Sequence, residues 1–395
     1  MKEGWEIKKL KDISVLIADG DWIESKHQSD EGIRLIQTGN IGNGVFKAKE
    51  DKPHYISEHT FDELGCTEIF SGDCLVSRLP EPVGRACLLP EIGCRMITAV
   101  DCSIIRFKEM ILPKLFIYYT QSTAYNRDIS NHTTGTTRKR ISRKNLESIS
   151  IPVPPLEEQE RIVGELDCLS GVIEKKKEQL KELDALAQSI FYEMFGNPVE
   201  NDRGWEVEKL GNKAEISSSK RIFANEYTDS GIPFYRGKEV TEKSKGNPIS
   251  VELYISKERY AEIKLNYGIP SVGDILVTAV GTIGNIWVVD SEEPFYFKDG
   301  NVLWLRIKDG TNPVYFKYIL TILIDKYKEM MANGCAYSAL TIVNLKEMPT
   351  CVTPLSLQQQ FAEKIESIEK QKELIRKSIE EVELLFNSRM DYYFN

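Results

Sequence analysis

The densest basic segment of the chain is residues 138–144, where five of seven positions are cationic. The cations are Arg138, Lys139, Arg140, Arg143 and Lys144. Residues 133–137, directly before them, are Thr-Thr-Gly-Thr-Thr, a loop rich in hydroxyl groups. Cationic and hydroxyl side chains are groups that contact the phosphate oxygens of DNA. The segment therefore predicts DNA contact, and the alternative interpretation is a solvated basic loop at the start of a helix.

Several other side chains are of the types that contact base edges, for which Arg, Gln and Asn are the usual bidentate partners. In residues 1–155 the candidates are Gln37, Thr38, Asn40, Arg78 and Arg85. In residues 201–353 the candidates at or near aligned places are Arg236, Lys238, Thr278 and Asn285. Two domains that recognise different DNA sequences would be expected to have different side chains at aligned positions. For each single residue, an ordinary surface polar group is an equally good interpretation.

The sequence shows no set of residues arranged for catalysis or for binding a cofactor. It has no G-x-x-x-x-G-K-[ST] loop, and its four histidines have no H-E-x-x-H spacing. Its eight cysteines form no C-x-x-C pair, so we expect reduced core thiols rather than a zinc site. We expect no metal and no cofactor. A stand-alone enzyme with duplicated catalytic domains is the weakest interpretation, because no acid–base pair stands out at aligned positions.

The candidate residues lie in a chain whose sequence contains an internal repeat. Residues 4–10 (Gly-Trp-Glu-Ile-Lys-Lys-Leu) recur as residues 204–210 (Gly-Trp-Glu-Val-Glu-Lys-Leu). The match continues from residues 72–77 to 273–278 and from 106–108 to 306–308. A period near 200 residues is too long for a solenoid, whose units run to about 50 residues. The sequence therefore predicts a duplicated domain, with two similar sites in one chain.

Both halves read as mixed helix and strand. Strand-like runs fall at residues 74–77, 86–89 and 103–107, with counterparts at 275–279, 286–289 and 302–307. Helical patterns follow at residues 112–121 and 313–331. Short strands with few crossover helices predict an α+β fold.

Two long proline-free stretches, residues 157–195 and 355–394, predict helices with an apolar seam. The seam residues are Ile162, Leu166, Leu169, Ile173, Leu180, Leu183, Ile190, Phe361, Ile365, Ile368, Ile375, Ile379 and Val382. A helix with one narrow seam needs a partner, and we expect the other copy, running antiparallel. The alternative is a helix folded flat on its own domain, which would favour a broader apolar face. The antiparallel pair predicts two domains separated by a spacer and related by a pseudo-twofold axis.

These boundaries divide the chain into residues 1–155, 156–200, 201–353 and 354–395. The net charge of −9 is concentrated on the two helical segments, which carry eight of the nine excess negative charges. Residues 1–155 contain 21 basic and 21 acidic side chains, and residues 201–353 contain 19 and 20. Each globular domain is nearly neutral and could have a basic face. No apolar stretch is long enough to span a membrane, so we expect a cytoplasmic protein with no membrane partner.

Over its whole length the chain resembles the DNA specificity subunits of Type I restriction-modification enzymes. The resemblance rests on the two Gly-Trp-Glu motifs at residues 4–10 and 204–210. It also rests on residues 151–159 (Ile-Pro-Val-Pro-Pro-Leu-Glu-Glu-Gln) and on residues 191–198 (Phe-Tyr-Glu-Met-Phe-Gly-Asn-Pro), which begin and end the first long helix. In the second copy, residues 353–359 (Thr-Pro-Leu-Ser-Leu-Gln-Gln) have lost part of the proline run.

The resemblance implies two target-recognition domains, each reading one half of a split, asymmetric site in double-stranded DNA. It implies that antiparallel helices set the spacing of the two parts. It also implies that methyltransferase subunits, two of them, and helicase-nuclease restriction subunits are partners that supply the catalysis. The chain itself would then be a non-enzymatic adaptor. The rival interpretation from another class is a coiled-coil scaffold for partner subunits with no DNA readout of its own.

Overall fold

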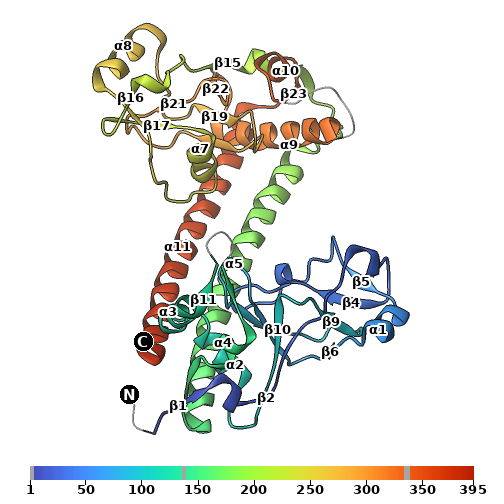
Figure 1. The fold of residues 1–395 in the computed structure, drawn as a ribbon. Helices are drawn as coiled ribbons and strands as arrows, with labels where there is room; N and C mark the ends of the chain where they lie inside the picture. Colours follow the sequence, from blue (N-terminus) through green and yellow to red (C-terminus); the bar gives the residue numbers. More distant parts are fainter. Residues whose placement is uncertain (1–3, 136–138, 333–338) are drawn as a thin grey trace. The chain divides into compact units, whose positions relative to one another are not determined.

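The computed structural model describes residues 4–135, 139–332 and 339–395 (Figure 1). The chain divides into two compact units, one of residues 1–177 and 376–395 and the other of residues 178–375. Each unit contains one globular domain and part of the two longest helices, α5 (Leu156–Phe195) and α11 (Leu355–Phe394). The sequence therefore predicts both long helices to within one residue of their observed bounds.

The first domain is built on an antiparallel sheet of strand order β2-β10-β7-β8 and a mixed sheet of order β3-β5-β4-β9-β6. A third, two-stranded sheet pairs β1 with β13. The strands are β1 (Glu6–Lys9), β2 (Ser14–Asp19), β3 (Gln28–Ser29), β4 (Ile33–Ile36), β5 (Tyr55–Ile56), β6 (Glu68–Ile69), β7 (Cys74–Ser77), β8 (Ala86–Leu88), β9 (Met96–Thr98), β10 (Cys102–Phe107), β11 (Thr133–Thr134), β12 (Arg140–Ile141) and β13 (Ser150–Val153). The helices are η1 (Leu10–Asp12), η2 (Ser25–His27), η3 (Thr38–Asn40), α1 (Glu58–Leu64), α2 (Pro113–Tyr119), α3 (Thr123–His132) and α4 (Arg143–Glu147).

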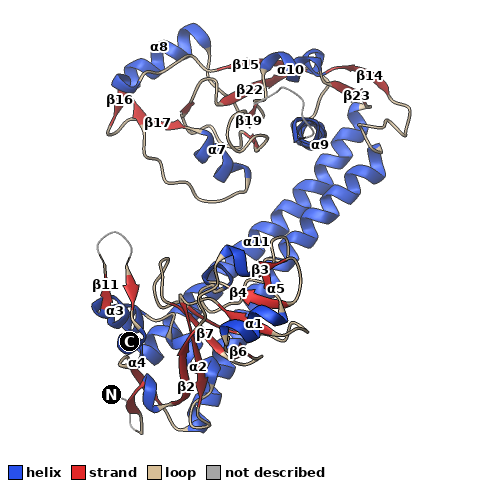
Figure 2. Cartoon of the chain, turned by 45° about the vertical axis from the view of Figure 1, so that its right-hand side comes forward, coloured by secondary structure: helices blue, strands red, loops and turns tan. Residues whose placement is uncertain are grey.

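The second domain repeats this topology, with sheets of order β15-β22-β19-β20, β16-β18-β17-β21 and β14-β23. The strands are β14 (Glu206–Lys209), β15 (Ala214–Ser218), β16 (Tyr227–Thr228), β17 (Ile232–Tyr235), β18 (Tyr254–Ile255), β19 (Ile275–Thr278), β20 (Ile286–Val288), β21 (Tyr296–Phe297), β22 (Val302–Ile307) and β23 (Pro349–Val352). The helices are α6 (Leu210–Lys213), η4 (Ala224–Glu226), α7 (Gly237–Ser244), α8 (Lys257–Tyr267), α9 (Pro313–Ala332) and α10 (Ile342–Glu347). Helices and strands are mixed in both domains, which confirms the α+β prediction (Figure 2).

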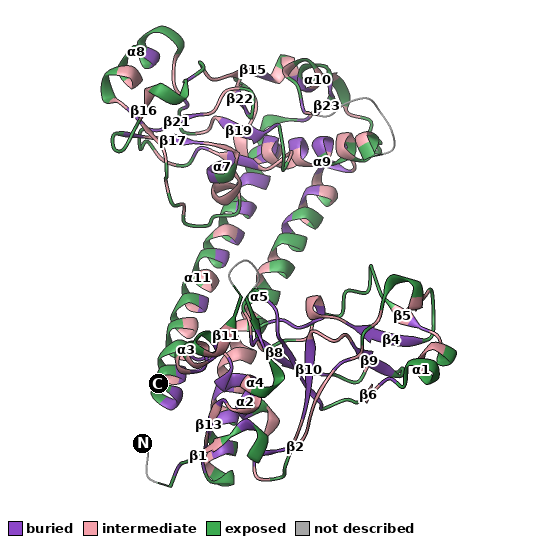
Figure 3. Cartoon of the chain, in the orientation of Figure 1, coloured by how far each residue is buried: buried purple, intermediate pink, exposed green. Residues whose placement is uncertain are grey.

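Apolar strands form the centre of each domain. Every residue of β7 and of its counterpart β19 is buried. Strands β4, β9 and β10 are buried over most of their lengths (Figure 3). Burial of such side chains is the main term that stabilises the fold, at about 25 cal/mol for each Å² removed from water.

The long helices lie beside each other in both units. In the first unit, Arg389 pairs with Glu165, and Lys177 pairs with Glu383 at 2.8 Å. In the second unit, the rings of Phe191 and Phe361 are 5.6 Å apart. Rising residue numbers on α5 meet falling numbers on α11 in the first unit, so the helices there run antiparallel, as predicted.

Every predicted seam residue is buried or half-buried. The seam also continues into the domains, since Ile162 and Leu166 join the core of the first domain and Phe361 and Ile365 join that of the second. Each helix therefore packs on its own domain over its first turns and on the other long helix further along. The predicted pairing with the other long helix is therefore confirmed, and the alternative of a helix folded flat on its own domain is wrong, since each long helix contributes to both units.

A lysine interrupts the apolar seam of α11 and is buried there. Lys372 is 7% exposed, and its Nζ atom lies 2.7 Å from both Asp184 Oδ1 and Glu369 Oε1. A buried polar group at a seam position fixes the register of a helix pair, usually at some cost in stability. In the second unit, the ion pair between Lys372 and Asp184 therefore holds this turn of α11 beside the turn of α5 that contains Asp184.

Candidate nucleic-acid interface

The basic segment of the first domain lies between a short hairpin and the start of a helix. Strand β12 pairs with β11, and Ser142 caps α4 because its Oγ accepts a hydrogen bond from the Asn145 N–H at 3.2 Å. The four described cations of the segment are all exposed: Lys139, Arg140, Arg143 and Lys144. Arg138 lies outside the described residues. The hairpin and cap thus hold a group of cations in water, as a phosphate-binding surface requires.

Two carboxylates lie among these cations at one end of the main sheet. Asp101 Oδ1 is 2.8 Å from Nη2 of Arg140, and Asp19 Oδ2 is 3.9 Å from Nη1 of Arg143. Asp19 also pairs through Oδ1 with Nη1 of Arg78 at 3.0 Å. The ends of β2 and β7 and the starts of β12 and α4 therefore bring Arg78, Arg140 and Arg143 close to one another.

Arg78 itself is a buried member of this group, with only 5% of its surface exposed. Its Nη2 donates to the Val100 carbonyl at 2.7 Å, in addition to the Asp19 contact. Burial lowers the pKa of Arg78, the Asp19 carboxylate opposes that shift, and the nearby Arg140 charge adds to it. The side chain is held from inside the domain, and it supports the exposed arginines rather than joining them at the surface.

Arg85 does not lie at the surface. It is 9% exposed and donates four hydrogen bonds to the backbone carbonyls of Thr38, Ile41, Leu79 and Pro82, at 2.7–3.0 Å. These bonds tie the turn between β7 and β8 to the loop that contains η3. The base-contact expectation for Arg85 is corrected to an internal role, because its guanidinium is buried and bonded to the backbone. Thr38 contributes a carbonyl to this contact.

Asn285 has the same role in the second domain. It precedes β20 as Arg85 precedes β8, and its Nδ2 donates to Thr241 Oγ1 at 3.1 Å and to the Thr282 carbonyl at 3.0 Å. Thr278 is fully buried and donates to the same Thr282 carbonyl. Asn285 and Thr278 therefore also belong to the internal support of a turn. The base-contact expectation is corrected for Thr278, whose side chain has no access to solvent.

The structural alignment confirms the predicted match of residues 72–77 with 273–278. The Thr278 N–H bonds to the Asn285 carbonyl as the Ser77 N–H bonds to that of Arg85, so Thr278 is the counterpart of Ser77. The next residue, Ala279, corresponds to Arg78, since the carbonyl of each accepts a hydrogen bond from the segment before α10 or α4. Arg78 thus has an apolar counterpart.

The loops that contain Gln37 and Arg236 do align as predicted. Each of these residues begins a helical segment, and its N–H bonds to a side chain three positions later, Asn40 in one domain and Glu239 in the other. Asn40 is 6% exposed and Glu239 is 2% exposed. The expectation that Asn40 contacts bases is corrected, because its amide caps η3 and its Nδ2 donates to the Lys47 carbonyl at 2.8 Å.

The remaining second-domain candidates, Arg236 and Lys238, are accessible and share a carboxylate. Both pair with Glu252 at 2.8 Å. Hydrogen bonds from Lys238 and then from Arg236 lower the pKa of Glu252 to about 2. At neutral pH this group is ionised and holds the two cations beside each other.

Sequence reasoning missed a second group of cations in this domain. Lys220 and Arg221 follow β15, and Lys298 follows β21. Arg221 Nε lies 2.7 Å from Asp299 Oδ2, and Lys298 lies 3.7 Å from Asp299 Oδ1. The signal in the sequence was weak, because these cations come from loops far apart in the chain and form no run.

At the places where the first domain has its charged group, the second domain is neutral. Pairing in the two main sheets aligns Asp19 with Ser218 and Asp101 with Asn301. The helix caps Ser142 and Thr341 align Arg143 with Ile342 and Lys144 with Val343, which is 68% exposed. The two domains therefore present different chemistry on the same framework.

A buried glutamine anchors each long helix to its domain, and its role was also not foreseen. Gln159 accepts from the Leu112 N–H at 2.8 Å and donates to the Met110 and Pro154 carbonyls. Gln358 accepts from the Asn312 N–H at 2.8 Å and donates to the Thr353 carbonyl at 2.9 Å. The sequence did contain a signal for these anchors, since each glutamine lies in the first turn of its helix, shortly after the proline that precedes that helix.

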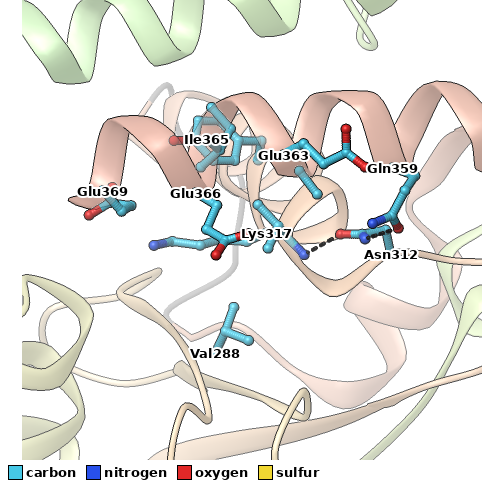
Figure 4. A pocket seen from close by; sticks show the side chains of 11 residues that line it. Val288, Asn312, Lys317, Gln359, Glu363, Ile365, Glu366 and Glu369 are labelled. Carbon is cyan, nitrogen blue, oxygen red and sulfur yellow. Dashed lines mark hydrogen bonds between the residues drawn. The ribbon is translucent and has the colours of Figure 1, made fainter. Parts of the chain in front are cut away.

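Each unit also has an open hollow beside its long helix. In the second unit a cavity of about 450 Å³ lies between Lys317 of α9 and three carboxylates of α11, Glu363, Glu366 and Glu369 (Figure 4). The first unit has a hollow of about 440 Å³, where Asp167 of α5 binds Lys114 at 2.6 Å. Helix carboxylates thus line a similar recess in both units.

Among the described residues, no group of three or more His, Cys, Asp or Glu side chains could hold a metal ion. Burial raises the pKa of the Cys87 and Cys102 thiols to about 12, so both stay protonated at neutral pH and are poor nucleophiles. No helix in the described ranges is long and apolar enough to cross a membrane.

Comparison with known proteins gives a consistent family. The model described as the Type I restriction modification DNA specificity domain matches twice, over residues 2–185 and 202–384. A type I restriction enzyme specificity subunit of Haemophilus influenzae is 29% identical over 240 residues, which is 60% of this chain and 60% of the relative. One from Methanocaldococcus jannaschii is 23% identical over 407 residues, covering 96% of this chain and 90% of the relative.

A solved structure has the same fold. The S subunit of a Type-I restriction-modification system from M. genitalium covers 98% of this chain and 95% of its own, with a TM-score of 0.54 and 15% identity. At that identity the likeness concerns the fold alone. It agrees with the duplicated topology described above.

Proposed function

The chain belongs to the Type I restriction modification DNA specificity family, and from this premise we propose that it is a specificity subunit that reads a bipartite, asymmetric site in double-stranded DNA. The observation that carries the proposal is one framework used twice with unlike surfaces. Residues 139–144 give the first domain a cationic surface, whereas the aligned part of the second domain is neutral. Two unlike surfaces would read two unlike half-sites.

We assign DNA contact to the exposed cations of each domain. In the first domain these are Lys139, Arg140, Arg143 and Lys144, and Gln37 remains a candidate for contact to a base. In the second domain they are Lys220, Arg221 and Lys238, together with the half-buried Arg236. The contacts of Arg236 and Lys238 with Glu252 leave N–H donors of the guanidinium and ammonium groups available to phosphates or base edges.

The long helices would set the gap between the half-sites. A helix of 40 residues is roughly 60 Å long at 1.5 Å per residue, and half-sites on one face of DNA repeat about every 34–36 Å. The antiparallel helix contacts and the buried Lys372 support a spacer of fixed register. Removing one helical turn from both helices should shorten the preferred gap in the DNA target, and an unchanged gap would rule the spacer out.

The catalysis of such a system would reside in partner subunits, with this chain as a non-catalytic adaptor. We propose that methyltransferase subunits, one for each unit, and restriction subunits dock on it. The acid-lined hollows beside α5 and α11 support docking on the helices, because each offers carboxylates and apolar surface together. Two similar hollows in two similar units agree with two copies of one partner.

The deciding experiment is co-expression with a partner methyltransferase subunit, followed by genome-wide mapping of methylated bases. We expect a single motif with two specified parts around an unspecified gap. Methylation at an undivided motif would mean that one domain is not a reader. Methylation without sequence preference would favour the rival function, a scaffold that assembles partner subunits without reading DNA.

A further inference from the structure

Two carboxylates lie where DNA binding should disfavour them. Asp19 and Asp101 are next to the exposed arginines of the first domain, and their charges repel the phosphates that those arginines would attract. If the surface served only for nonspecific attraction, neutral residues would be better at both positions. The contacts of the two carboxylates suggest a different use.

Asp19 connects the interior of the domain to its surface. One oxygen binds the buried Arg78 at 3.0 Å and accepts from Ser103 Oγ at 3.2 Å, while the other faces Arg143. Because Arg78 is also fixed to the Val100 carbonyl, the Asp19 carboxylate has little freedom to move. Its second oxygen lies 3.9 Å from Arg143 Nη1, and Glu147 of the same helix lies 3.4 Å from Arg143 Nε, so two carboxylates in defined places attract the Arg143 guanidinium.

Asp101 does the same for Arg140. Its carboxylate lies 2.8 Å from Arg140 Nη2, and its own backbone carbonyl accepts from the Arg78 N–H. The side chain of Arg140 remains 45% exposed. One edge of its guanidinium is therefore held by the protein, while other N–H groups are accessible to a ligand.

Holding an arginine in this way favours base readout. The guanidinium is a planar fork whose two N–H groups match the O6 and N7 acceptors of guanine in the major groove. A free arginine side chain loses much rotamer entropy on making such a contact, whereas one already oriented loses less. Orientation matters for a bidentate contact and matters little for attraction to a phosphate.

The second domain shows that these residues occur together or not at all. Its counterparts of Asp19, Asp101 and Arg78 are Ser218, Asn301 and Ala279, and its counterpart of Arg143 is Ile342. The carboxylates are absent where the arginines are absent. If the two acids served only to stabilise the fold, they would not need to be present only in the domain that has the arginines.

We propose that Asp101 and Asp19 are positioning residues, which orient Arg140 and Arg143 for bidentate contact with guanine in the half-site read by the first domain. This inference rests on the proposed function. It adds the class of base that one half-site must contain and the residues that make its recognition specific.

The test uses the complex with its methyltransferase partner and duplexes that carry the mapped motif. Dissociation constants are measured for the motif, for duplexes with each guanine replaced singly, and for a scrambled duplex. Asp101→Asn should lower discrimination at a guanine of one half-site by about tenfold, while binding scrambled DNA more tightly because one repelling charge is gone. Arg140→Lys keeps the charge and should lose about 10- to 100-fold in discrimination at the same guanine.

Asp101→Asn is expected to weaken discrimination at the guanine and to strengthen binding of scrambled DNA. A damaged domain would instead bind both duplexes less well, so the two measurements distinguish loss of positioning from loss of fold. Glu215→Gln, which removes the partner of Arg306 at the opposite end of the second domain's main sheet, is the matched control and should leave both half-sites unchanged. Unaltered discrimination in both Asp101→Asn and Arg140→Lys, or equal relaxation of both half-sites, would overturn the inference. If the wild-type complex prefers no divided motif, the proposed function fails first and the inference falls with it.

Discussion

The ends of the two main sheets carry cations from different parts of the chain. In the first domain Arg140 lies in strand β12 and Arg143 begins α4, and Arg78 supports them from the end of β7. In the second, the cations nearest the corresponding strand end are Lys220 and Arg221, from the loop after β15. The framework therefore fixes where a surface lies, while the loops decide which residues supply its charge.

Inside the domains, by contrast, different side chains at aligned positions have the same role. Arg85 and Asn285 differ in size and charge, yet both tie the turn before the next strand to an earlier segment, the loop of η3 in the first domain and helix α7 in the second. Asn40 and Glu239 differ in charge, yet both cap a helical segment. Divergence between the copies is therefore no guide to DNA readout unless the side chain reaches the surface.

Replacing the two turn anchors should give the largest effect. Arg85→Ala removes four hydrogen bonds to backbone carbonyls, of which only those of Thr38 and Leu79 keep another donor, and we expect it to reduce the free energy of unfolding by about 3–5 kcal/mol. Asn285→Ala removes a smaller amide and should cost about 1–2 kcal/mol. Urea unfolding of the full chain, followed by hydrogen exchange in each domain, measures both. Equal losses would contradict the difference expected between a guanidinium and an amide at this place.

The helix anchors should instead behave alike, because both copies keep a glutamine. Gln159→Leu and Gln358→Leu each leave a buried N–H and carbonyl groups unpaired, and each should cost about 2–3 kcal/mol in urea unfolding. The exposed Gln371 of α11 is the control, and Gln371→Leu should change stability by less than about 0.5 kcal/mol. A large cost at one anchor and none at the other would break the equivalence of the two helix junctions.

Exchanging one charge between the domains should change the salt dependence of DNA binding. Lys144 and Val343 occupy equivalent places after the helix caps. Lys144→Val should reduce the slope of log K against log salt by about 0.9, because one phosphate contact is lost. Val343→Lys should increase the slope by a similar amount if that part of the second domain also faces DNA. An unchanged slope in Lys144→Val would place the basic segment away from the phosphates.

Repetition and periodicity predicted the two long helices and three strands of each main sheet, but not β2, β15 or the second sheet of either domain. The seam of Leu and Ile at helical spacing located α5 and α11, and short apolar runs located β7, β10, β19 and β22. These features are local, since apolar spacing and proline positions are read directly from neighbouring residues. The duplicated motifs then supplied the second domain from the first.

The candidate interface was harder to predict, because the contacts that decide it join distant residues. Arg85 bonds to Thr38 and Ile41, which are more than 40 residues away in the sequence, so nothing near Arg85 shows that it is buried. Lys298 and Arg221 meet at Asp299 only through the folding of distant loops. Exposed runs such as residues 139–144 were found because their charges are adjacent in the sequence.

The smallest predicted effect concerns acid pH and the second domain alone. The pKa of Glu252, held at about 2 in the folded chain by Lys238 and Arg236, lies below the usual value of 4.5. Stability from this lowered pKa is fully present above the usual value and is lost as the pH falls through the folded one. Glu252→Gln should therefore lower the urea midpoint slightly at pH 6 and by much less near pH 2.

In the first domain the aligned loop is held by the cap between Gln37 and Asn40, neither of which titrates. That cap corresponds to the one between Arg236 and Glu239, to which Glu252 adds its ion pairs in the second domain. Asn40→Ala should consequently lower the urea midpoint by the same amount at both pH values. The contrast follows from chemistry, since an amide keeps its hydrogen bonds in acid, whereas a carboxylate loses its ion pairs once it is protonated. A pH-independent effect of Glu252→Gln would mean that Glu252 acts through packing, and the two loops would then differ in sequence without differing in behaviour.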